Sequence, residues 1–337
     1  MQFPLKENAS LQSLHTFGLD VKAAYYARIS QAEDLERVFA LPHEKLILGG
    51  GSNLVFLKDY PSLIVHLATK GIRELHRDSD HVWISVQAGE NWHEFVLWCL
   101  EHNYGGVENL SLIPGTVGAS PIQNIGAYGV ELESVFDHLI AIDISSGERQ
   151  KFTMEDCCFG YRDSVFKNNA KGKYCIVEVV FRLTCNRHEL VLNYGAIKSK
   201  LQDANISEPT IRDVSKAVIE IRNSKLPDPS VLGNAGSFFK NPIISKSLAT
   251  ALQRDFPKMP TYDLGDDEVK IPAAWMIEQT GWKGKRLGGV GVYEKHALVL
   301  VNHGSGQAGE LAELIGKIQS DVKTLLGIEL QTEVNLI

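Results

Sequence analysis

A run of glycines joins two strand-like segments near the N-terminus, and its context restricts the fold of this chain of 337 residues. Lys45–Leu48 is an apolar strand candidate, Gly49–Asn53 reads Gly-Gly-Gly-Ser-Asn, and Leu54–Leu57 resumes as a strand. Because neither GxGxxG nor GxxxxGK[ST] occurs, and because no helix follows the glycines, a Rossmann fold and a Walker-type P-loop are disfavoured. Consecutive glycines still offer backbone N–H groups to a phosphate. A tight hairpin turn is an equally good interpretation of an isolated glycine run.

A second segment, Ile113–Gly129, concentrates small residues, two prolines and hydrogen-bonding side chains over a length at which a regular element is normally more apolar. Backbone in such a segment approaches a large flat ligand closely and offers amides to its phosphates. A purely structural loop is the alternative, although loops of this length in compact domains are usually functional. The segment therefore favours a binding site.

Helix and strand signals alternate irregularly along the chain. Periodicity predicts helices at Gln31–Ala40, Trp92–His102, Ser207–Arg222 and between Leu311 and Leu326, and strands at Leu63–Leu67, His81–Gln87 and Cys175–Leu183. Ser207 is a candidate helix cap, Pro227 and Pro229 stop continuation of that helix, and Glu329–Ile337 is expected to be a terminal strand or extended arm. The mixed order predicts an α+β protein, and the length predicts two or three domains.

Composition limits the partners and the compartment. A formal net charge of −7 gives no excess of positive potential, so we expect neither a nucleic-acid nor a membrane partner. Met1–Ser10 lacks the features of a secretory signal or a transit peptide, and the apolar runs are too short to cross a bilayer. The five cysteines form an odd set without CxxC spacing, which favours a reducing compartment, the cytoplasm, over a disulfide framework or a metal site.

Several long motifs occur in a fixed order. The turn ILGGGSNLVF, the loop IPGTVGASPIQNIGAYG, and then FGYRDSVFK, KLPDP and GNAGSFFKNP follow one another, with Thr16–Gly18 before them and Thr332–Val334 after them. In this order and spacing they resemble the UDP-N-acetylenolpyruvylglucosamine reductases over essentially the whole chain. The segment at Tyr194 and Gly195 and the overall length resemble the longer subtype, which carries an additional tyrosine-bearing substrate loop.

The resemblance implies a fold and a reaction. The fold is the FAD-binding fold of the vanillyl-alcohol-oxidase (PCMH) type, with FAD-binding subdomains at residues 1–68 and 69–206 and a C-terminal α+β substrate-binding domain at residues 207–337. The reaction is the reduction of UDP-N-acetylglucosamine enolpyruvate to UDP-N-acetylmuramate by FAD and NADPH in peptidoglycan precursor synthesis. We expect a monomer. Another flavin oxidase of the same fold and a catalytically silent nucleotide-binding module are the competing interpretations.

The implied chemistry needs fixed positive charge and one proton donor, because hydride arrival at the terminal vinyl carbon leaves negative charge on the adjacent carbon and its carboxylate. The resemblance assigns these roles to three residues. Arg162 would brace the carboxylate with its planar fork of donors. Ser237 would donate the proton, and Glu333 would approach the carboxylate. Because two carboxylates in contact repel, we expect Glu333 to be protonated in the complex or bridged to the substrate by a donor.

Binding residues are carried over from the same motifs. The implied substrate contacts are Tyr194, Arg222, Lys225, Lys240 and Asn241. The implied FAD contacts are Gly49, Gly50, Gly51, Ser52, Asn53, Pro114, Gly115, Gly118, Ala119, Ser120, Gln123, Asn124, Gly126, Ala127, Tyr128 and Gly129. Ordinary packing is the alternative for Tyr194, and the basic run Lys283–Arg286 is either a solvated turn or a diphosphate-facing one.

Overall fold

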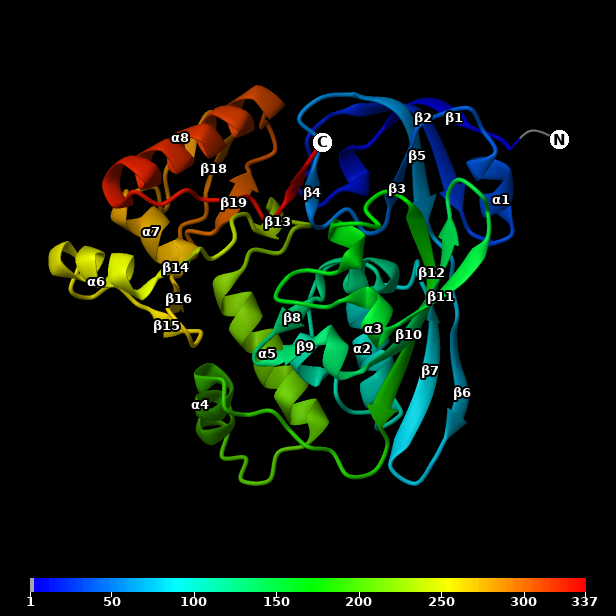
Figure 1. The fold of residues 1–337 in the computed structure, drawn as a ribbon, viewed down its shortest axis with the longest axis horizontal. Helices are drawn as coiled ribbons and strands as arrows, with labels where there is room; N and C mark the ends of the chain where they lie inside the picture. The colour runs from blue at the N-terminus through cyan, green and yellow to red at the C-terminus, as the bar shows by residue number, and fades with distance from the viewer. Residues whose placement is uncertain (1–2) are drawn as a thin grey trace. The chain divides into compact units, whose positions relative to one another are not determined.

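The computed structural model describes residues 3–337 and divides into two compact units. The first unit comprises residues up to Ala9, Ala23–Gly50 and Pro61–Ser224, and the second comprises Ser10–Lys22, Gly51–Tyr60 and Lys225–Ile337. Each unit combines helices with its own sheets (Figure 1), so the predicted α+β class is confirmed. Within residues 3–337, no helix has the length and apolar character needed to span a membrane.

In the described part of the first unit, from residue 3 onward, there are two larger sheets and five α-helices. The four-stranded sheet has the order β1 (Lys6–Ser10), β2 (Lys22–Ile29), β5 (Tyr60–Leu67), β3 (Lys45–Leu48). The five-stranded sheet has the order β11 (Arg149–Thr153), β10 (Phe136–Asp143), β12 (Tyr174–Thr184), β7 (His81–Gln87), β6 (Ile72–Arg77). The helices are α1 (Asp34–Phe39), α2 (Trp92–Glu101), α3 (Met154–Cys157), α4 (Gly195–Asp203) and α5 (Ile211–Lys225), and a short hairpin is formed by β8 (Gly126–Ala127) and β9 (Val130–Glu131).

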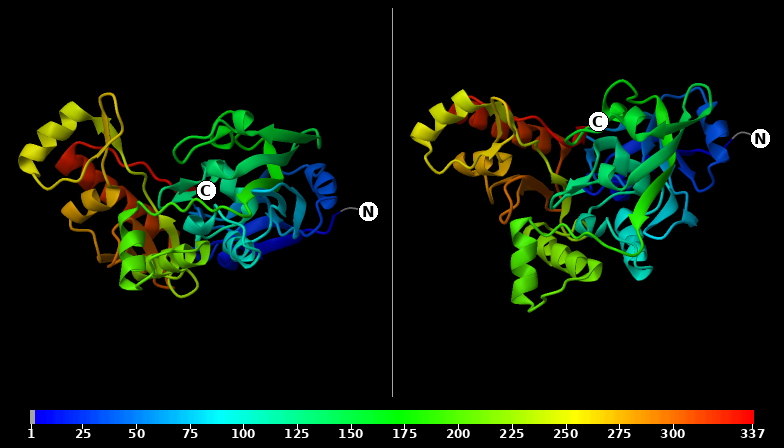
Figure 2. Two further views of the ribbon diagram at one scale, coloured as in Figure 1. Left: turned by 90° about the horizontal axis from the view of Figure 1, so that it is seen from below. Right: turned by 60° about the horizontal axis from the view of Figure 1, so that its bottom comes forward.

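Strand β12 connects two hydrophobic cores of the first unit. Val179 and Phe181 are buried in a core that includes α2, whereas Cys175 and Val177 are buried in a core that includes α1 and β5. Both faces of the strand are therefore buried over much of its length, and the single apolar face predicted for Cys175–Leu183 describes it only in part. Helices α4 and α5 pack together through a smaller apolar cluster (Figure 2).

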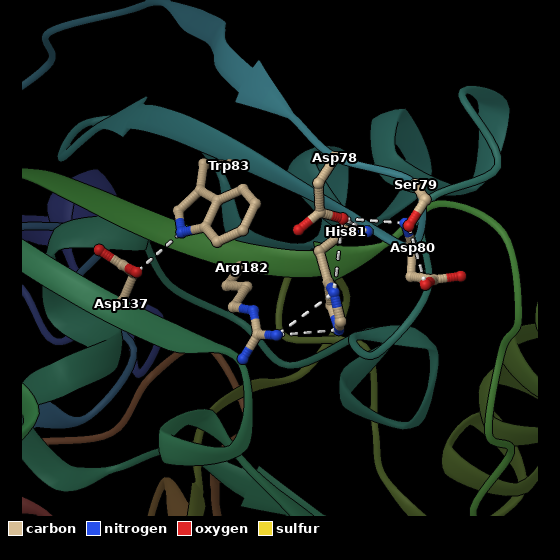
Figure 3. A network of polar contacts seen from close by, with 7 residues as sticks. All are labelled: Asp78, Ser79, Asp80, His81, Trp83, Asp137 and Arg182. Atoms are coloured by element: carbon tan, nitrogen blue, oxygen red, sulfur yellow. Dashed lines mark hydrogen bonds and ion pairs between the residues drawn. The ribbon is translucent and has the colours of Figure 1, made fainter.

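A polar network crosses the five-stranded sheet and fixes the register of three strands. The indole N–H of Trp83 on β7 donates to Asp137 on β10 at 2.8 Å, and the guanidinium of Arg182 on β12 lies 5.6 Å from the Trp83 ring centroid (Figure 3). An Nη atom of the same arginine lies 3.3 Å from the ring nitrogens of His81. Cross-strand contacts of this kind stabilise one pairing of strands over its alternatives.

The second unit is built on a four-stranded sheet with the order β13 (Gly233–Ser237), β19 (Val299–Asn302), β18 (Val290–Val292), β17 (Arg286–Leu287). A smaller sheet has the order β14 (Ile243–Ser245), β16 (Glu268–Lys270), β15 (Tyr262–Asp263), and the helices are α6 (Lys246–Asp255), α7 (Ala273–Gln279) and α8 (Ala308–Leu326). Helix α8 packs on β18 (Figure 1). The predicted apolar stripe of α8 is buried except for Leu325, which is exposed. Strand β4 (Leu54–Val55) pairs in parallel with the terminal strand β20 (Asn335–Leu336).

The helix predicted at Ser207–Arg222 starts and ends later than expected. Helix α5 runs from Ile211 to Lys225, so Ser207 is not its cap. Instead, the backbone N–H of Asp213 donates to Oγ1 of Thr210 at 3.3 Å, and the carboxylate of Asp213 accepts from the backbone N–H of Thr210 at 2.9 Å. This reciprocal capping box satisfies two N–H groups at once and therefore defines the helix start.

Candidate active site

The glycine turn after β3 lies against the second glycine-containing segment of the first unit. A β-carbon on Gly50 would stand 2.8 Å from the Cα of Gly115, and one on Gly49 would stand 2.5 Å from Oγ1 of Thr116. A side chain at residue 50 would therefore force the two backbones apart. The two segments form one continuous backbone surface without a side chain between them at this point.

The end of the turn lies in the second unit and needs glycine for a different reason. Gly51 has φ +61°, and a β-carbon there would overlap the carbonyl oxygen of Leu14. Its own carbonyl accepts a hydrogen bond from the N–H of Thr16 at 3.0 Å. The strands on either side of the turn pair elsewhere, β3 with β5 and β4 with β20, so the hairpin interpretation is wrong.

The segment Ile113–Gly129 is more regular than the loop predicted there. It contains a 3₁₀ helix at Val117–Gln123 and the strand β8, and its start is held by the N–H of Trp92, which donates to the carbonyl of Gly115 at 3.1 Å. The buried Asn124 ends the 3₁₀ helix with φ +43°. A non-glycine residue in this conformation is uncommon, and such residues cluster at functional sites.

Arg162 extends from the motif Phe159–Lys167 to the same segment. One of its Nη atoms donates to the carbonyl of Gly126 at 2.5 Å, and the other lies 3.8 Å from the carboxylate of Glu131. Its own backbone has φ +54°, and its carbonyl accepts from the Nζ of Lys167 at 3.0 Å. The guanidinium is thus held beside β8, where the carboxylate of Glu131 faces its positive charge.

Tyr128, at the end of Ile113–Gly129, is the centre of a second group of candidates. The ring of Tyr194 meets the ring of Tyr128 edge to face, with centroids 5.6 Å apart. The side-chain amide of Asn109 donates to the carbonyl of Tyr128 at 3.0 Å, while its own Oδ1 is buried without a partner among residues 3–337. The Nε atom of Arg222, near the end of α5, is likewise buried without a partner in this part of the chain.

Burial and neighbouring charges shift the pKa values of the side chains around Tyr128. Burial lowers the pKa of the Arg222 guanidinium, and the charge of Arg162 lowers it further. Burial also raises the pKa of the Tyr128 phenol, whereas the nearby Arg222 opposes that rise. The pKa of His93 on α2 is lowered by burial and then by the charge of Arg222. Arginine stays protonated in proteins, so Arg222 is a half-buried positive charge whose Nε atom is buried.

In the second unit the C-terminal segment lies beside the end of β13. The backbone N–H of Glu333 donates to the carbonyl of Phe238, the residue after Ser237, at 2.9 Å. The side-chain amide of Asn53, from the glycine turn, is 3.5 Å from the carbonyl oxygen of Glu333. Three sequence motifs are therefore brought together by hydrogen bonds, and two of them carry predicted catalytic residues.

Two predicted substrate contacts also lie on this part of the second unit. The backbone N–H of Lys240 donates to the carbonyl of Gln331 at 2.9 Å. The Oδ1 atom of Asn241 accepts from the N–H of Ala273 at 2.9 Å. Because Ala273 is the first residue of α7, this contact satisfies one of the N–H groups that a helix start leaves open. Asn241 therefore has a structural role that the sequence did not predict.

Lys225, the last residue of α5, belongs to the second unit and influences His296. Burial lowers the pKa of His296, and the charges of Lys225 and Lys283 lower it further. Lys283 itself forms an ion pair with Glu278 at 2.7 Å, so this end of the basic run Lys283–Arg286 is partnered. The half-buried His296 is therefore surrounded by two lysines and by Glu278, whose charge opposes theirs by raising the pKa of the histidine.

Sequence reasoning missed three residues of the first unit that hold the candidates in place. These are His93, whose Nδ1 accepts from the N–H of Leu112 at 3.0 Å, together with Asn109 and Glu131. Asn109 carries no local signal, since it stands between Glu108 and Leu110 in a segment of mixed polarity. His93 and Glu131 carry none, because the groups they meet come from other elements.

The residues present fit a large, flat, anionic cofactor in the first unit. Two glycine-bearing segments are in backbone contact there, a buried guanidinium nitrogen and a buried amide oxygen have no partner among residues 3–337, and two aromatic rings lie beside them. FAD is large, has a flat aromatic ring system and carries a diphosphate, so close backbone approach, aromatic side chains and positive charge suit it. Among residues 3–337, no group of three or more His, Cys, Asp or Glu side chains is placed to hold a metal ion.

Comparison with known proteins agrees with these features. Residues 23–149 match the family described as an FAD binding domain, and residues 228–337 match the family described as the UDP-N-acetylenolpyruvoylglucosamine reductase C-terminal domain. Proteins named UDP-N-acetylenolpyruvoylglucosamine reductase from Flavobacterium johnsoniae and Pseudomonas aeruginosa are each 46% identical, covering 99% and 100% of both chains respectively. The homologue from Amoebophilus asiaticus is 47% identical over 99% of both chains.

A solved structure supports the fold. The crystal structure of UDP-N-acetylenolpyruvylglucosamine reductase from Thermus caldophilus superposes with a TM-score of 0.68 at 21% identity, covering 99% of this chain and 98% of that one. The fold and the two matched domains define a flavoprotein with an FAD-binding domain of the PCMH type followed by a separate C-terminal domain. Within that class, the chain belongs to the UDP-N-acetylenolpyruvoylglucosamine reductase family. The family resemblance identified from the motifs is confirmed.

Proposed function

We propose that the protein uses FAD and NADPH to reduce UDP-N-acetylglucosamine enolpyruvate to UDP-N-acetylmuramate, a step of peptidoglycan precursor synthesis. The observation that carries this proposal is the identity of 46% to named reductases over 99% of the chain. Backbone contact between the glycine turn and the segment Ile113–Gly129 supports it, since this surface matches the needs of a flavin nucleotide. The glycine turn and the segment Ile113–Gly129 would hold FAD, which would supply a carrier for hydride between NADPH and the terminal vinyl carbon of the sugar nucleotide.

The proposal includes the assignment of FAD to the N-terminal part of the chain. Residues 1–68 and 69–206 would form the two FAD-binding subdomains, and residues 207–337 the substrate-binding domain. The FAD-binding and C-terminal family matches, at residues 23–149 and 228–337, support this division. The sixteen glycine-turn and loop residues predicted from the motifs would line the cofactor.

Arg162, Ser237 and Glu333 are proposed as the catalytic residues. Arg162 binds and orients the substrate carboxylate with its planar fork of donors, and the hydrogen bond to the carbonyl of Gly126 supports this role by fixing the guanidinium. Ser237 is half-buried and ends β13. Its Oγ donates a proton to the substrate carbon that becomes negatively charged. A serine hydroxyl is a weak acid, so this step needs neighbouring donors that stabilise the alkoxide left behind. Glu333 approaches the same carboxylate, protonated or bridged to it by a donor.

The sugar nucleotide itself is proposed to bind through Tyr194, Arg222, Lys225, Lys240 and Asn241. The exposed ring of Tyr194, set against Tyr128, supports the proposal that the chain is of the longer subtype with a tyrosine-bearing substrate loop. We also propose a monomer in the cytoplasm. All five cysteines are free, which agrees with a reducing compartment.

The colour of the flavin tests this function in two steps. The purified protein should be yellow, should bleach anaerobically with NADPH, and should regain its colour when UDP-N-acetylglucosamine enolpyruvate is added. The second step decides, because neither another flavin oxidase nor a silent nucleotide-binding module predicts it. Bleaching by an alcohol, or a colourless protein that takes up no FAD, would contradict the proposal.

A further inference from the structure

The segment Ile113–Gly129 begins directly after a leucine with an unusual backbone conformation. Leu112 has φ +58°, in the left-handed region that bulky L side chains rarely adopt. Its side chain is half-buried and the preceding Ser111 is fully buried, so Leu112 is not the tip of an exposed loop. A bulky residue stays in this region only where the surrounding structure determines its conformation. Specific contacts therefore have to hold the chain at Leu112.

The imidazole of His93 on α2 provides such a contact. Its Nδ1 atom accepts from the backbone N–H of Leu112 at 3.0 Å, and no backbone carbonyl among residues 3–337 accepts from that N–H. An imidazole whose Nδ1 accepts is neutral and carries its proton on Nε2. Burial lowers the pKa of the half-buried His93, the charge of Arg222 on α5 lowers it further, and the charge of Glu94 on α2 raises it. Burial and the arginine thus favour the form that can accept.

The first turn of α2 also holds the chain on both sides of Leu112. The indole N–H of Trp92 donates to the carbonyl of Leu110 at 2.9 Å, and the backbone N–H of Trp92 donates to the carbonyl of Gly115 at 3.1 Å. The bond from His93 is the one made at the strained residue itself. Two neighbouring residues of one helix therefore direct the chain into the glycine-containing segment.

We propose that His93 is a positioning residue for the cofactor: its Nδ1 atom holds Leu112 in the left-handed conformation and thereby sets the conformation in which Ile113–Gly129 binds FAD. This inference rests on the proposed function, which assigns that segment to FAD. Gly115, one of the proposed FAD contacts, is only three residues beyond Leu112. Without the bond from His93 the segment relaxes to other conformations, and the affinity for FAD falls with the fraction of protein that keeps the binding conformation.

Substitutions of His93 separate the hydrogen bond from the rest of the side chain. His93→Leu removes the acceptor and keeps a side chain of similar size. His93→Asn keeps an acceptor, since Oδ1 of asparagine and Nδ1 of histidine are both bonded to Cγ. His102→Leu is the matched control, because His102 is an exposed histidine at the other end of α2.

Substitutions of Leu112 in the His93→Leu background test whether the bond acts through the backbone. Leu112→Gly removes the conformational penalty, because glycine adopts positive φ readily. Leu112→Ala removes most of the same side chain but keeps the penalty. A histidine that only fills space would give no reason for glycine to restore what alanine does not.

The measurement is the rate at which FAD leaves the loaded full chain after dilution, followed by flavin fluorescence, with circular dichroism as the check on folding. Because an unpaired donor weakens the binding conformation, FAD should leave His93→Leu at least about tenfold faster than the wild type, and His93→Asn at a rate within about threefold of it. Adding Leu112→Gly to His93→Leu should slow release at least about threefold, whereas adding Leu112→Ala should not. His102→Leu should release FAD at the wild-type rate.

Each outcome either supports the inference or overturns it. Release from His93→Leu at the wild-type rate, an equal acceleration in the His102→Leu control, or equal effects of glycine and alanine at residue 112 would overturn it, as would His93→Asn behaving like His93→Leu. If His93→Leu fails to fold, recovery of the fold by Leu112→Gly alone supports the inference, and failure of that double variant to fold overturns it. A wild-type protein that binds no FAD would instead contradict the proposed function.

Discussion

The backbones of Gly50 and Gly115 are in direct contact, so that a β-carbon on Gly50 would lie 2.8 Å from the Cα of Gly115 and 3.1 Å from its carbonyl carbon. These residues come from two separate glycine-containing motifs, and neither motif predicts the contact. Each glycine run is locally compatible with an ordinary turn. Their contact explains why residue 50 carries no side chain, and it joins two weak sequence signals into one surface.

The substitution Gly50→Ala tests this contact. The added methyl group would push the turn away from Gly115, so we expect the free energy of unfolding to fall by about 1–3 kcal/mol, as in other overpacked sites. Retention of FAD during gel filtration should fall with it. Urea unfolding monitored by fluorescence measures the first effect, and the ratio of flavin to protein absorbance measures the second.

Gly316→Ala in α8 is the control for Gly50→Ala. A β-carbon at residue 316 meets no atom within 4 Å, and alanine is the better helix former by about 1 kcal/mol. Stability should therefore stay constant or rise, with FAD retained. A Gly50→Ala protein as stable and as yellow as the control would show that the two loops separate without cost.

Short strands and helix ends can be predicted from the sequence when the residues that determine them are neighbours in the chain. The strands β3 and β7 have the predicted bounds, since each is a short run of apolar or alternating residues between turn residues. The start of α5 lies later than the predicted Ser207, because a single capping residue is a weaker start signal than a reciprocal pair. The reciprocal pair Thr210 and Asp213 is the stronger signal, and it was available in the sequence.

Long-range relationships were not predictable from one sequence. Nothing in Leu54–Val55 indicates that it pairs with Asn335–Leu336 at the other end of the chain. The motifs identified Arg162 as a candidate, but not that the carbonyl of Gly126 and the carboxylate of Glu131 fix its guanidinium. The environment of Arg222 likewise depends on packing against residues remote in sequence, which no local pattern encodes.

Ser237→Ala should separate the two halves of the proposed reaction. Removing Oγ leaves hydride transfer from NADPH intact, but it removes the proton donor for the carbon that receives negative charge. We expect flavin bleaching at the wild-type rate and recolouring slowed by about 10²–10⁴-fold, the usual contribution of a positioned acid. Stopped-flow absorbance under anaerobic conditions measures both rates. Ser207→Ala, which removes an exposed serine, should change neither, and an equal slowing of both half-reactions in Ser237→Ala would point to a structural defect.

Asn241 allows its structural and binding roles to be separated by two substitutions. Asn241→Ala removes the acceptor for the N–H of Ala273 and should cost about 1 kcal/mol of stability, as loss of a helix cap does. Asn241→Asp keeps an acceptor and adds a negative charge that the start of α7 favours, so its stability should match the wild type. If Asn241 binds the diphosphate, the like charge in Asn241→Asp should raise KM for the sugar nucleotide at least about tenfold. An unchanged KM in Asn241→Asp would confine the residue to its structural role.

The cysteines should react with thiol reagents in an order set by burial. Burial raises the pKa of Cys157 and of Cys175 to about 12, and it raises the pKa of Cys99 as well. Because the thiolate is the reactive form, a raised pKa leaves these three thiols protonated at pH 8. Cys158 is exposed and Cys185 half-buried, so labelling with a chromogenic disulfide should show a fast phase from Cys158, a slower one from Cys185, and the remaining three only in denaturant. Cys158→Ser should abolish the fast phase; its persistence would mean that a thiol buried in this structure opens readily to solvent.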